Sequence, residues 1–221
     1  MNLQLLSVKY FNLPICNQPD ERQLCLKRYT MDFFKFKNKI EPAKGKLLIS
    51  EPFLPDPNFE RTIILLCDHN TEGSFGFVLN KPSIANIGEI MEDFKKIDSP
   101  VFIGGPVQQD TLHFLHQIKD LEKAVEVADG IYWGGDFDQL YTLFDTGQIS
   151  SSEVRFFLGY SGWSEGQLDN ELKEDSWIVS EDVTHDLVFR TKPEDMWQRT
   201  LKEMGGRFSI YSNYPVDPRL N

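Results

Sequence analysis

The chain has 221 residues, of which 40% are hydrophobic and 26% are charged, a balance that excludes wholesale disorder and allows one folded domain without a disulfide or metal staple. Residues 1–44 hold 8 Lys and Arg against 4 Asp and Glu, so the remaining 177 residues hold 15 against 30. Because nonspecific binding to nucleic acid depends on cations that neutralise phosphates, this acidic body argues against direct nucleic-acid binding.

The N-terminal part of the chain differs from the rest. Its first 44 residues show no sustained hydrophobic period, and strong patterning begins at Gly45. We therefore expect a flexible extension at residues 1–44, an α+β domain at 45–205 and a tail at 206–221. Met31 is an alternative start of the biological chain, and we expect residues 1–30 to be dispensable.

Short apolar and β-branched runs predict strands along the domain. The first two are residues 46–50 and 62–67, and Pro52, Pro55 and Pro57 exclude a helix between them. A hairpin then returns at 75–79, with Gly73 in its polar turn and Asn80, Lys81 and Pro82 at its end. Further strands are expected at 101–103, 111–116, 130–133, 154–160 and 176–179.

About four helices are expected from residues suited to N-terminal capping. Asn86 with Glu89 opens a helix to about residue 94, and Asp136 with Gln139 opens one over 137–144. Ser164 with Gln167 opens a third through residue 172. Thr191 with Glu194 opens a fourth that ends at Gly205 and Gly206. Strands outnumber helices and show no βαβ rhythm. The pattern therefore favours an α+β fold with a mixed, largely antiparallel sheet.

Three glycine clusters, at residues 104–106, 134–136 and 159–163, are candidates for chemistry. None has the spacing of a phosphate-binding loop, which favours turns at strand ends, although the second leads into a helix start where an anion could bind. The third approaches the G-x-S-x-G nucleophile elbow, but Trp163 replaces its last glycine. A hydrolase that uses Ser161 or His69 is therefore an alternative hypothesis and not the favoured one.

The remaining reactive side chains favour structural roles. Cys67, His69, His113 and His116 lack the spacing of a zinc site, and no cysteine lies in a C-x-x-C pair, which indicates a reducing compartment. No run of 18 apolar residues and no signal-peptide core is present, so we expect a cytoplasmic protein away from membranes. We expect no metal and no cofactor.

Several motifs occur together in one order. They include Gly45 to Ile49, Gly76 to Pro82, Gly104 to Val107, Gly134 to Asp136 and Phe157 to Trp163. In this combination, from about residue 45 to 205, the chain resembles the bacterial AlgH/YqgE family. The resemblance implies an α+β fold with a bent sheet that approaches a pseudo-barrel, and it implies a link to transcriptional regulation.

The favoured function is a non-catalytic regulatory module that binds a protein or a small molecule, and a DNA-associated regulator is the other alternative. No helix-turn-helix with a basic recognition helix is visible. Loop residues that follow strands are the candidate ligand site, where residues 56–61, 80–82 and 104–107 could converge with 159–163. The candidates are Arg61, Asn80, Gly104, Gly105, Ser161 and Trp163.

Overall fold

The structure is a computed structural model that describes residues 40–215. Residues 1–39 of the predicted extension, with Cys16, Cys25 and Met31, lie outside the described residues. The strands of the described part are β1 (Leu47–Ser50), β2 (Ile63–Asn70), β3 (Gly73–Val78), β4 (Pro82–Asn86), β5 (Pro100–Ile103), β6 (Val107–His116), β7 (Val125–Ala128), β8 (Ile131–Trp133), β9 (Val154–Ser164) and β10 (Trp177–Ser180).

Helices occupy the segments between and after these strands. They are α2 (Ile87–Ile90), α3 (Phe137–Asp145), α4 (Gln167–Lys173), α5 (Pro193–Met204) and α6 (Gly206–Tyr211), with the 3-10 turns η1 (Glu92–Phe94) and η2 (Ser151–Glu153) and the π-helix η3 (Asp186–Arg190). Within residues 40–215, no helix is long and apolar enough to cross a membrane.

The strands form one bent sheet in the order β10-β1-β2-β3-β9-β6-β8-β7, with β5 and then β4 branching from β9. In the described part of the chain every strand pair is antiparallel except β5 with β9. The α+β fold with a mixed, largely antiparallel sheet is therefore confirmed. The sheet has free ends at β10 and β7, so it is not a closed barrel.

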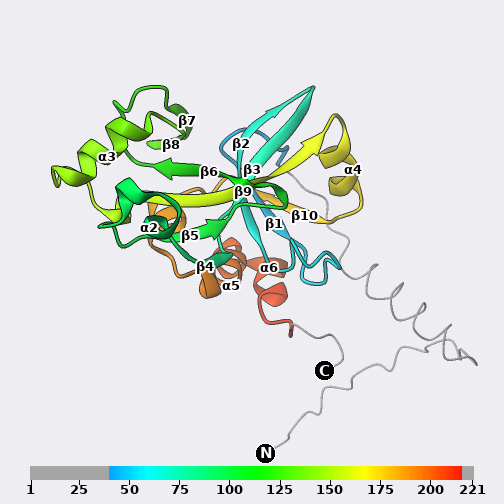
Figure 1. Ribbon diagram of the computed structural model, residues 1–221. Helices are drawn as coiled ribbons and strands as arrows, with labels where there is room; N and C mark the ends of the chain where they lie inside the picture. The colour runs from blue at the N-terminus through cyan, green and yellow to red at the C-terminus, as the bar shows by residue number, and fades with distance from the viewer. Residues whose placement is uncertain (1–39, 216–221) are drawn as a thin grey trace, which may run out of the picture. The chain divides into compact units, whose positions relative to one another are not determined.

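Strand β9 joins the two halves of the sheet and runs through the middle of the molecule (Figure 1). Its first part lies between β5 and β6, and its last four residues pair with β3, where Ser161 lies opposite Gly76. Between these parts, Gly159 has a φ of +65°, and a Cβ there would lie 2.6 Å from the carbonyl oxygen of Val107. Only glycine fits this kink, which turns one strand from one half of the sheet into the other.

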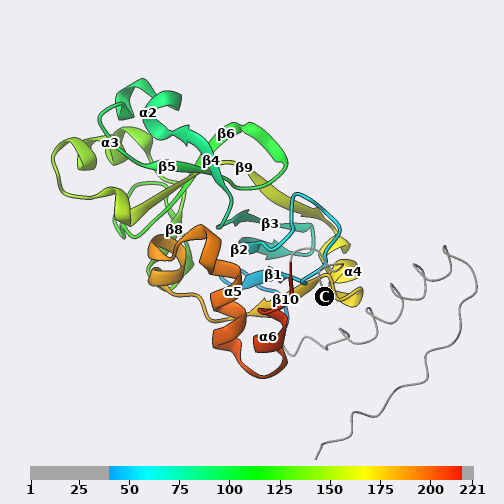
Figure 2. The ribbon, with the colours of Figure 1, turned by 90° about the horizontal axis from the view of Figure 1, so that it is seen from below.

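Each half of the sheet has its own hydrophobic cluster. In the half that contains β1, β2 and β3, Leu168 of α4 belongs to the same cluster as Leu48, Ile64 and Trp177. In the other half, α2, η1 and α3 cover β5 and β6 (Figures 1 and 2). Helix α5 lies against β1, where the indole of Trp197 donates to the carbonyl of Ser50 at 3.0 Å.

The predicted helices exist with shifted ends. The capping box of Asn86 and Glu89 is confirmed, but Met91 is extended, so α2 stops at Ile90 and η1 follows as a separate turn. Helix α3 has Asp136 as its N-cap, as predicted. Helix α4 begins after Gly166 and not after Ser164; helix α5 begins at Pro193 with Lys192, and not Thr191, as N-cap.

Several strand predictions were too short or missing. Strands β4 and β7 were not predicted, nor were η3 and α6, the latter within the segment called a tail. Strands β6 and β9 are longer than predicted. As a result, residues 159–163 lie inside β9 and are neither a strand-end turn nor a loop after a strand. Ser161 therefore does not sit on the strand-to-helix turn that a nucleophile elbow requires.

Candidate functional site

A cavity of about 540 Å³ lies beside the kink in β9, where the two halves of the sheet meet. Five elements supply its walls: β2, β3, β6, β8 and β9, together with the β2–β3 turn. The lining residues are Asp68, Asn70, Glu72, Gly73, Ser74, Phe75, Phe77, Val107, His113, Trp133, Tyr160, Gly162 and Trp163. This volume lies in the range of small-molecule sites, which is about 300 to 1,000 Å³.

Five rings form a continuous aromatic wall in this cavity, and we call them the aromatic wall. They are Phe75, Phe77, His113, Trp133 and Tyr160. Ring centroids are 4.8 Å apart for Phe75 and Trp133, 6.1 Å for Phe75 and Tyr160, and 5.3 Å for Phe77 and His113. All but Phe77 are half-buried, so their remaining surface is accessible to a ligand.

The strand register explains why these rings share one face. Phe75 and Phe77 are two residues apart on β3, so both side chains leave the same face of the sheet, and Tyr160 and Gly162 do the same on β9. Gly162 lies opposite Phe75 in the β3–β9 pair. A Cβ at Gly162 would lie 3.1 Å from the ring of Tyr160, so the glycine lets this ring lie close to the backbone beside Phe75.

The rim of the cavity is acidic. Asp68 accepts hydrogen bonds from the backbone N–H of His69 at 2.9 Å and from the side-chain amide of Asn70 at 3.0 Å, which hold its carboxylate in place. Glu72 is exposed in the β2–β3 turn, where its backbone N–H donates to the Asn70 side chain at 2.8 Å. No lysine or arginine is among the residues that line the cavity.

His113 is held as a neutral imidazole in the wall. The hydroxyl of Thr111 donates to the carbonyl of Gln108 at 2.7 Å, so it has only lone pairs left for the Nε2 atom of His113 at 3.0 Å. Nε2 therefore carries the proton and donates, and Nδ1 is the acceptor. Burial lowers the pKa of the His113 imidazole below its ordinary value, so the ring carries no charge at neutral pH.

Three of the predicted site residues, Gly104, Gly105 and Ser161, lie together behind the cavity. The hydroxyl of Ser161 is fully buried and donates to the carbonyl of Gly104 at 3.0 Å. A Cβ at Gly104 would lie 2.3 Å from the carbonyl oxygen of Gly159, and one at Gly105 would lie equally close to the backbone of Tyr160. These glycines allow backbone to pack on backbone next to the kink.

Arg61 and Asn80 meet at the far ends of β2 and β3. The Asn80 side chain accepts from the N–H of Ile63 at 3.0 Å and donates to the carbonyl of Arg61 at 2.8 Å. The Arg61 guanidinium donates to the carbonyl of Tyr214 at 2.5 Å and lies 4.8 Å from the ring centre of Trp197. Both side chains thus form hydrogen bonds within the protein, but the Nε atom of Arg61 is buried without a hydrogen-bond partner among the described residues.

The predicted convergence of loops occurs through hydrogen bonds. Lys81 donates to the carbonyls of Pro57 and Asn58 at 2.6 and 2.7 Å, and the carbonyl of Lys81 accepts from Ile103, next to Gly104. However, of the six predicted site residues only Trp163 borders the cavity. Its indole packs in the first hydrophobic cluster. That these six residues bind a ligand stays a prediction.

The histidines bond mainly to neutral groups. His69 shares a hydrogen bond of 2.7 Å with Ser74, and the Nε2 of His116 bonds the carbonyl of Gly134 at 2.8 Å. Within residues 40–215, no group of three or more His, Cys, Asp or Glu side chains could hold a metal ion. Cys67 is buried, and burial raises the pKa of its thiol, so it behaves as a small hydrophobic side chain.

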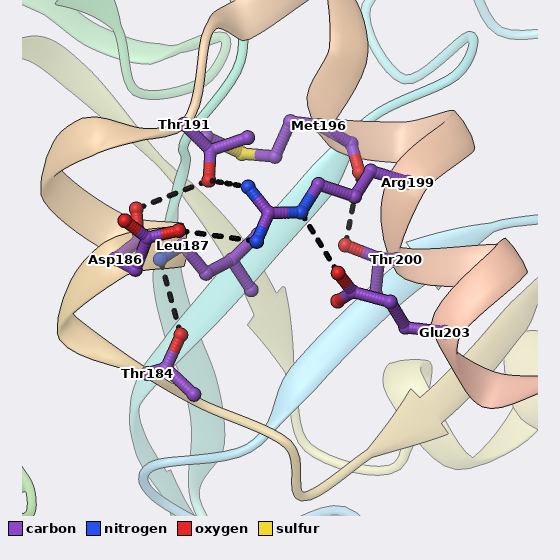
Figure 3. A network of polar contacts seen from close by, with 8 residues as sticks. All are labelled: Thr184, Asp186, Leu187, Thr191, Met196, Arg199, Thr200 and Glu203. Atoms are coloured by element: carbon purple, nitrogen blue, oxygen red, sulfur yellow. Dashed lines mark hydrogen bonds and ion pairs between the residues drawn. The ribbon is translucent and has the colours of Figure 1, made fainter.

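A second polar cluster surrounds Arg199 on α5 (Figure 3). Its guanidinium contacts Asp186 at 3.1 Å, Glu203 at 2.8 Å and the hydroxyl of Thr191 at 3.2 Å. All three nitrogens of the guanidinium are thus directed at groups of the protein. The cluster fastens the π-helix η3 to α5, and we assign it a structural role.

The aromatic wall was not predicted from the sequence, although part of its signal is visible there. The spacing of Phe75 and Phe77, two residues apart in a predicted strand, indicates one shared face. The contributions of Trp133 and Tyr160 depend on the pairing of β6 with β8 and of β3 with β9. Those pairings join residues that lie far apart in the sequence, and no local motif reveals them.

Known proteins share this architecture and much of this sequence. An AlgH-like family model (DUF179) matches residues 47–209. A UPF0301 protein of Cytophaga hutchinsonii is 48% identical over 181 residues, which cover 81% of this chain and 99% of the relative. A UPF0301 protein of Bacteroides thetaiotaomicron is 40% identical over 192 residues, 86% of this chain and 97% of the relative.

Two solved structures are similar over most of the domain. The solution structure of the AlgH protein from Pseudomonas aeruginosa has a TM-score of 0.62 and 28% identity, and the match covers 81% of this chain and 98% of that one. The crystal structure of protein DIP2367 from Corynebacterium diphtheriae has a TM-score of 0.66 at 21% identity, covers 81% of this chain and 95% of that one, and shares the fold. From the family model, the relatives and the fold together, the chain belongs to the AlgH-like family.

Proposed function

We propose that this protein is a non-catalytic regulatory module that binds a small molecule in the cavity beside the β9 kink. The observation that carries the proposal is the aromatic wall, in which four half-buried rings face a space of about 540 Å³. Ligand sites are typically concave and mostly apolar, with a few polar groups that fix the orientation of the ligand. Asp68 and the Nδ1 atom of His113 are such groups here.

The surroundings of the candidate nucleophiles favour binding over catalysis. A serine nucleophile needs a base within hydrogen-bonding reach, and the hydroxyl of Ser161 donates to a backbone carbonyl instead. His69 bonds to Ser74 and lies next to Asp68, which accepts from the backbone and from the Asn70 amide and not from the imidazole. A hydrolase would lose its turnover in Ser161→Ala or His69→Ala.

The acidic body favours a regulatory action that does not pass through DNA. With a net charge of −11 the chain repels phosphates, and we expect no gel shift of duplex or single-stranded DNA at submicromolar protein and physiological salt. A shift that weakens as salt is added would favour the DNA-associated regulator.

A ligand-observed NMR screen of aromatic, cationic and phosphorylated fragments tests the binding proposal. We compare the wild type with Tyr160→Ala, which opens the aromatic wall, and with Tyr141→Ala, which removes a half-buried ring of α3 that packs on Phe94. Fragments should bind the wild type and Tyr141→Ala and lose at least about tenfold in affinity for Tyr160→Ala. Equal binding to all three proteins would contradict the proposal.

A further inference from the structure

The aromatic wall has the composition of a site for organic cations. The faces of indole, phenol and phenyl rings carry negative electrostatic potential and attract cations within about 6 Å of the ring centre. Phe75 lies within 6.1 Å of Trp133, Phe77 and Tyr160, so one small group in front of it can contact several rings. Aromatic rings that surround one space are the usual binding site for quaternary ammonium groups.

The charges around the cavity also favour a cationic ligand. Asp68 and Glu72 lie on its rim, and its lining contains neither lysine nor arginine. His113, the remaining basic side chain of the lining, donates its Nε2 proton to Thr111 and presents a lone pair at Nδ1. An anion would meet repulsion from the two carboxylates, whereas a cation would gain attraction from them and from the rings.

We propose that the ligand of this cavity is a small organic cation that combines an aromatic ring with an ammonium group. The proposal rests on the binding function inferred above and specifies its ligand class. The ammonium group lies against the rings of the aromatic wall, on the side of the carboxylates of Asp68 and Glu72, and the ring of the ligand packs on the remaining surface of the wall. A peptide with a methylated lysine would offer similar chemistry, and its binding is an outcome that the test distinguishes.

Three ligands that share a phenyl ring and differ in charge provide the test. Benzyltrimethylammonium, benzyl alcohol and benzoate are titrated into the full chain, and the dissociation constants are taken from NMR shifts of the Trp133 and Tyr160 ring signals. We expect the cation to bind at least about fivefold more tightly than the alcohol, since a ring–cation contact and a nearby carboxylate each contribute a factor of this order. Benzoate should bind most weakly.

Two charge variants separate the rim from the overall charge. Glu72→Gln removes an exposed rim carboxylate, and Asp145→Asn removes an exposed carboxylate at the end of α3, outside the cavity lining. We expect Glu72→Gln to weaken the cation about twofold to fivefold without changing the alcohol, and Asp145→Asn to change neither. Neither substitution touches a buried group, so both proteins should fold.

The outcomes distinguish the proposed ligand class from the proposed binding of a small molecule in this cavity. If the alcohol or benzoate shifts the Trp133 and Tyr160 signals as strongly as the cation does, the cationic class is overturned and the cavity remains a binding site. If none of the three shifts these signals, both proposals fall. A trimethyl-lysine peptide is titrated in the same way; if it binds and none of the three small ligands does, the ligand is a protein segment and the small-molecule proposal is overturned.

Discussion

Acidification should weaken the fold through His116, whose contribution adds to that of His113. His116 is fully buried, its Nε2 bonds the carbonyl of Gly134 at 2.8 Å, and its Nδ1 accepts from the N–H of Ile118 at 3.1 Å. These two bonds fix the neutral ring with its proton on Nε2. A second proton would break the bond from Ile118 and place a charge in the core. Burial therefore lowers the pKa of His116 from 6.5 to about 4.

The size and sign of the effect follow from proton linkage. Between the two pKa values the unfolded chain binds a proton that the folded protein does not, so the free energy of unfolding falls as the pH falls from about 6.5 to about 4. Each pKa unit corresponds to about 1.4 kcal/mol, which gives a loss of about 3 kcal/mol. Below pH 4 both states bind the proton, and this contribution stops changing.

Urea unfolding at pH 7, 6, 5 and 4 measures the effect in the wild type and in His116→Gln. Glutamine keeps an N–H group for Gly134 but does not titrate, so the carboxylates that respond to acid are common to both proteins. We expect the wild type to lose about 3 kcal/mol more than the variant between pH 7 and pH 4. Curves that run parallel to within about 1 kcal/mol would refute the assignment.

Two further pairs of substitutions test the packing around the site. Both Trp163 and Trp177 donate their indole N–H to one oxygen of Glu171, at 2.8 and 2.7 Å, so Glu171→Ala should cost about 2 to 4 kcal/mol in urea unfolding, and Glu171→Gln, which keeps an acceptor, under about 1 kcal/mol. Gly104→Ala should cost about 3 kcal/mol because its Cβ meets backbone, while Gly147→Ala, with open space around it, should cost about 1 kcal/mol for its φ of +68°. Equal losses within either pair would contradict the packing.

Local features of the sequence predicted local structure well. The capping box of Asn86 and Glu89 and the N-cap Asp136 depend on residues three apart or fewer, and the hairpin between β2 and β3 depends on one short turn. The interactions that fix these features join residues within one short window of sequence. No comparable local pattern predicts the π-helix η3. Strand β4 was missed because Pro82 and the exposed Ile84 do not show the usual pattern of a strand.

The candidate site was harder to predict because it depends on distant contacts. The Val107 carbonyl of β6 excludes any side chain at the Gly159 kink, and 52 positions of sequence separate these two residues. The same holds for Trp133, which reaches Phe75 only after β8 has paired with β6. The glycine clusters were predicted to form the site themselves. In the structure these glycines allow the backbone packing next to the aromatic wall.

The most direct test of the central claim is an NMR titration of the isotope-labelled protein with benzyltrimethylammonium, read at every assigned aromatic and backbone signal. Saturable shifts should appear together at Phe75, Trp133, Tyr160 and the Asp68 backbone, which surround the cavity beside the β9 kink. Saturable shifts confined to another surface, or no shifts at millimolar ligand, would contradict the assignment of this cavity as the binding site.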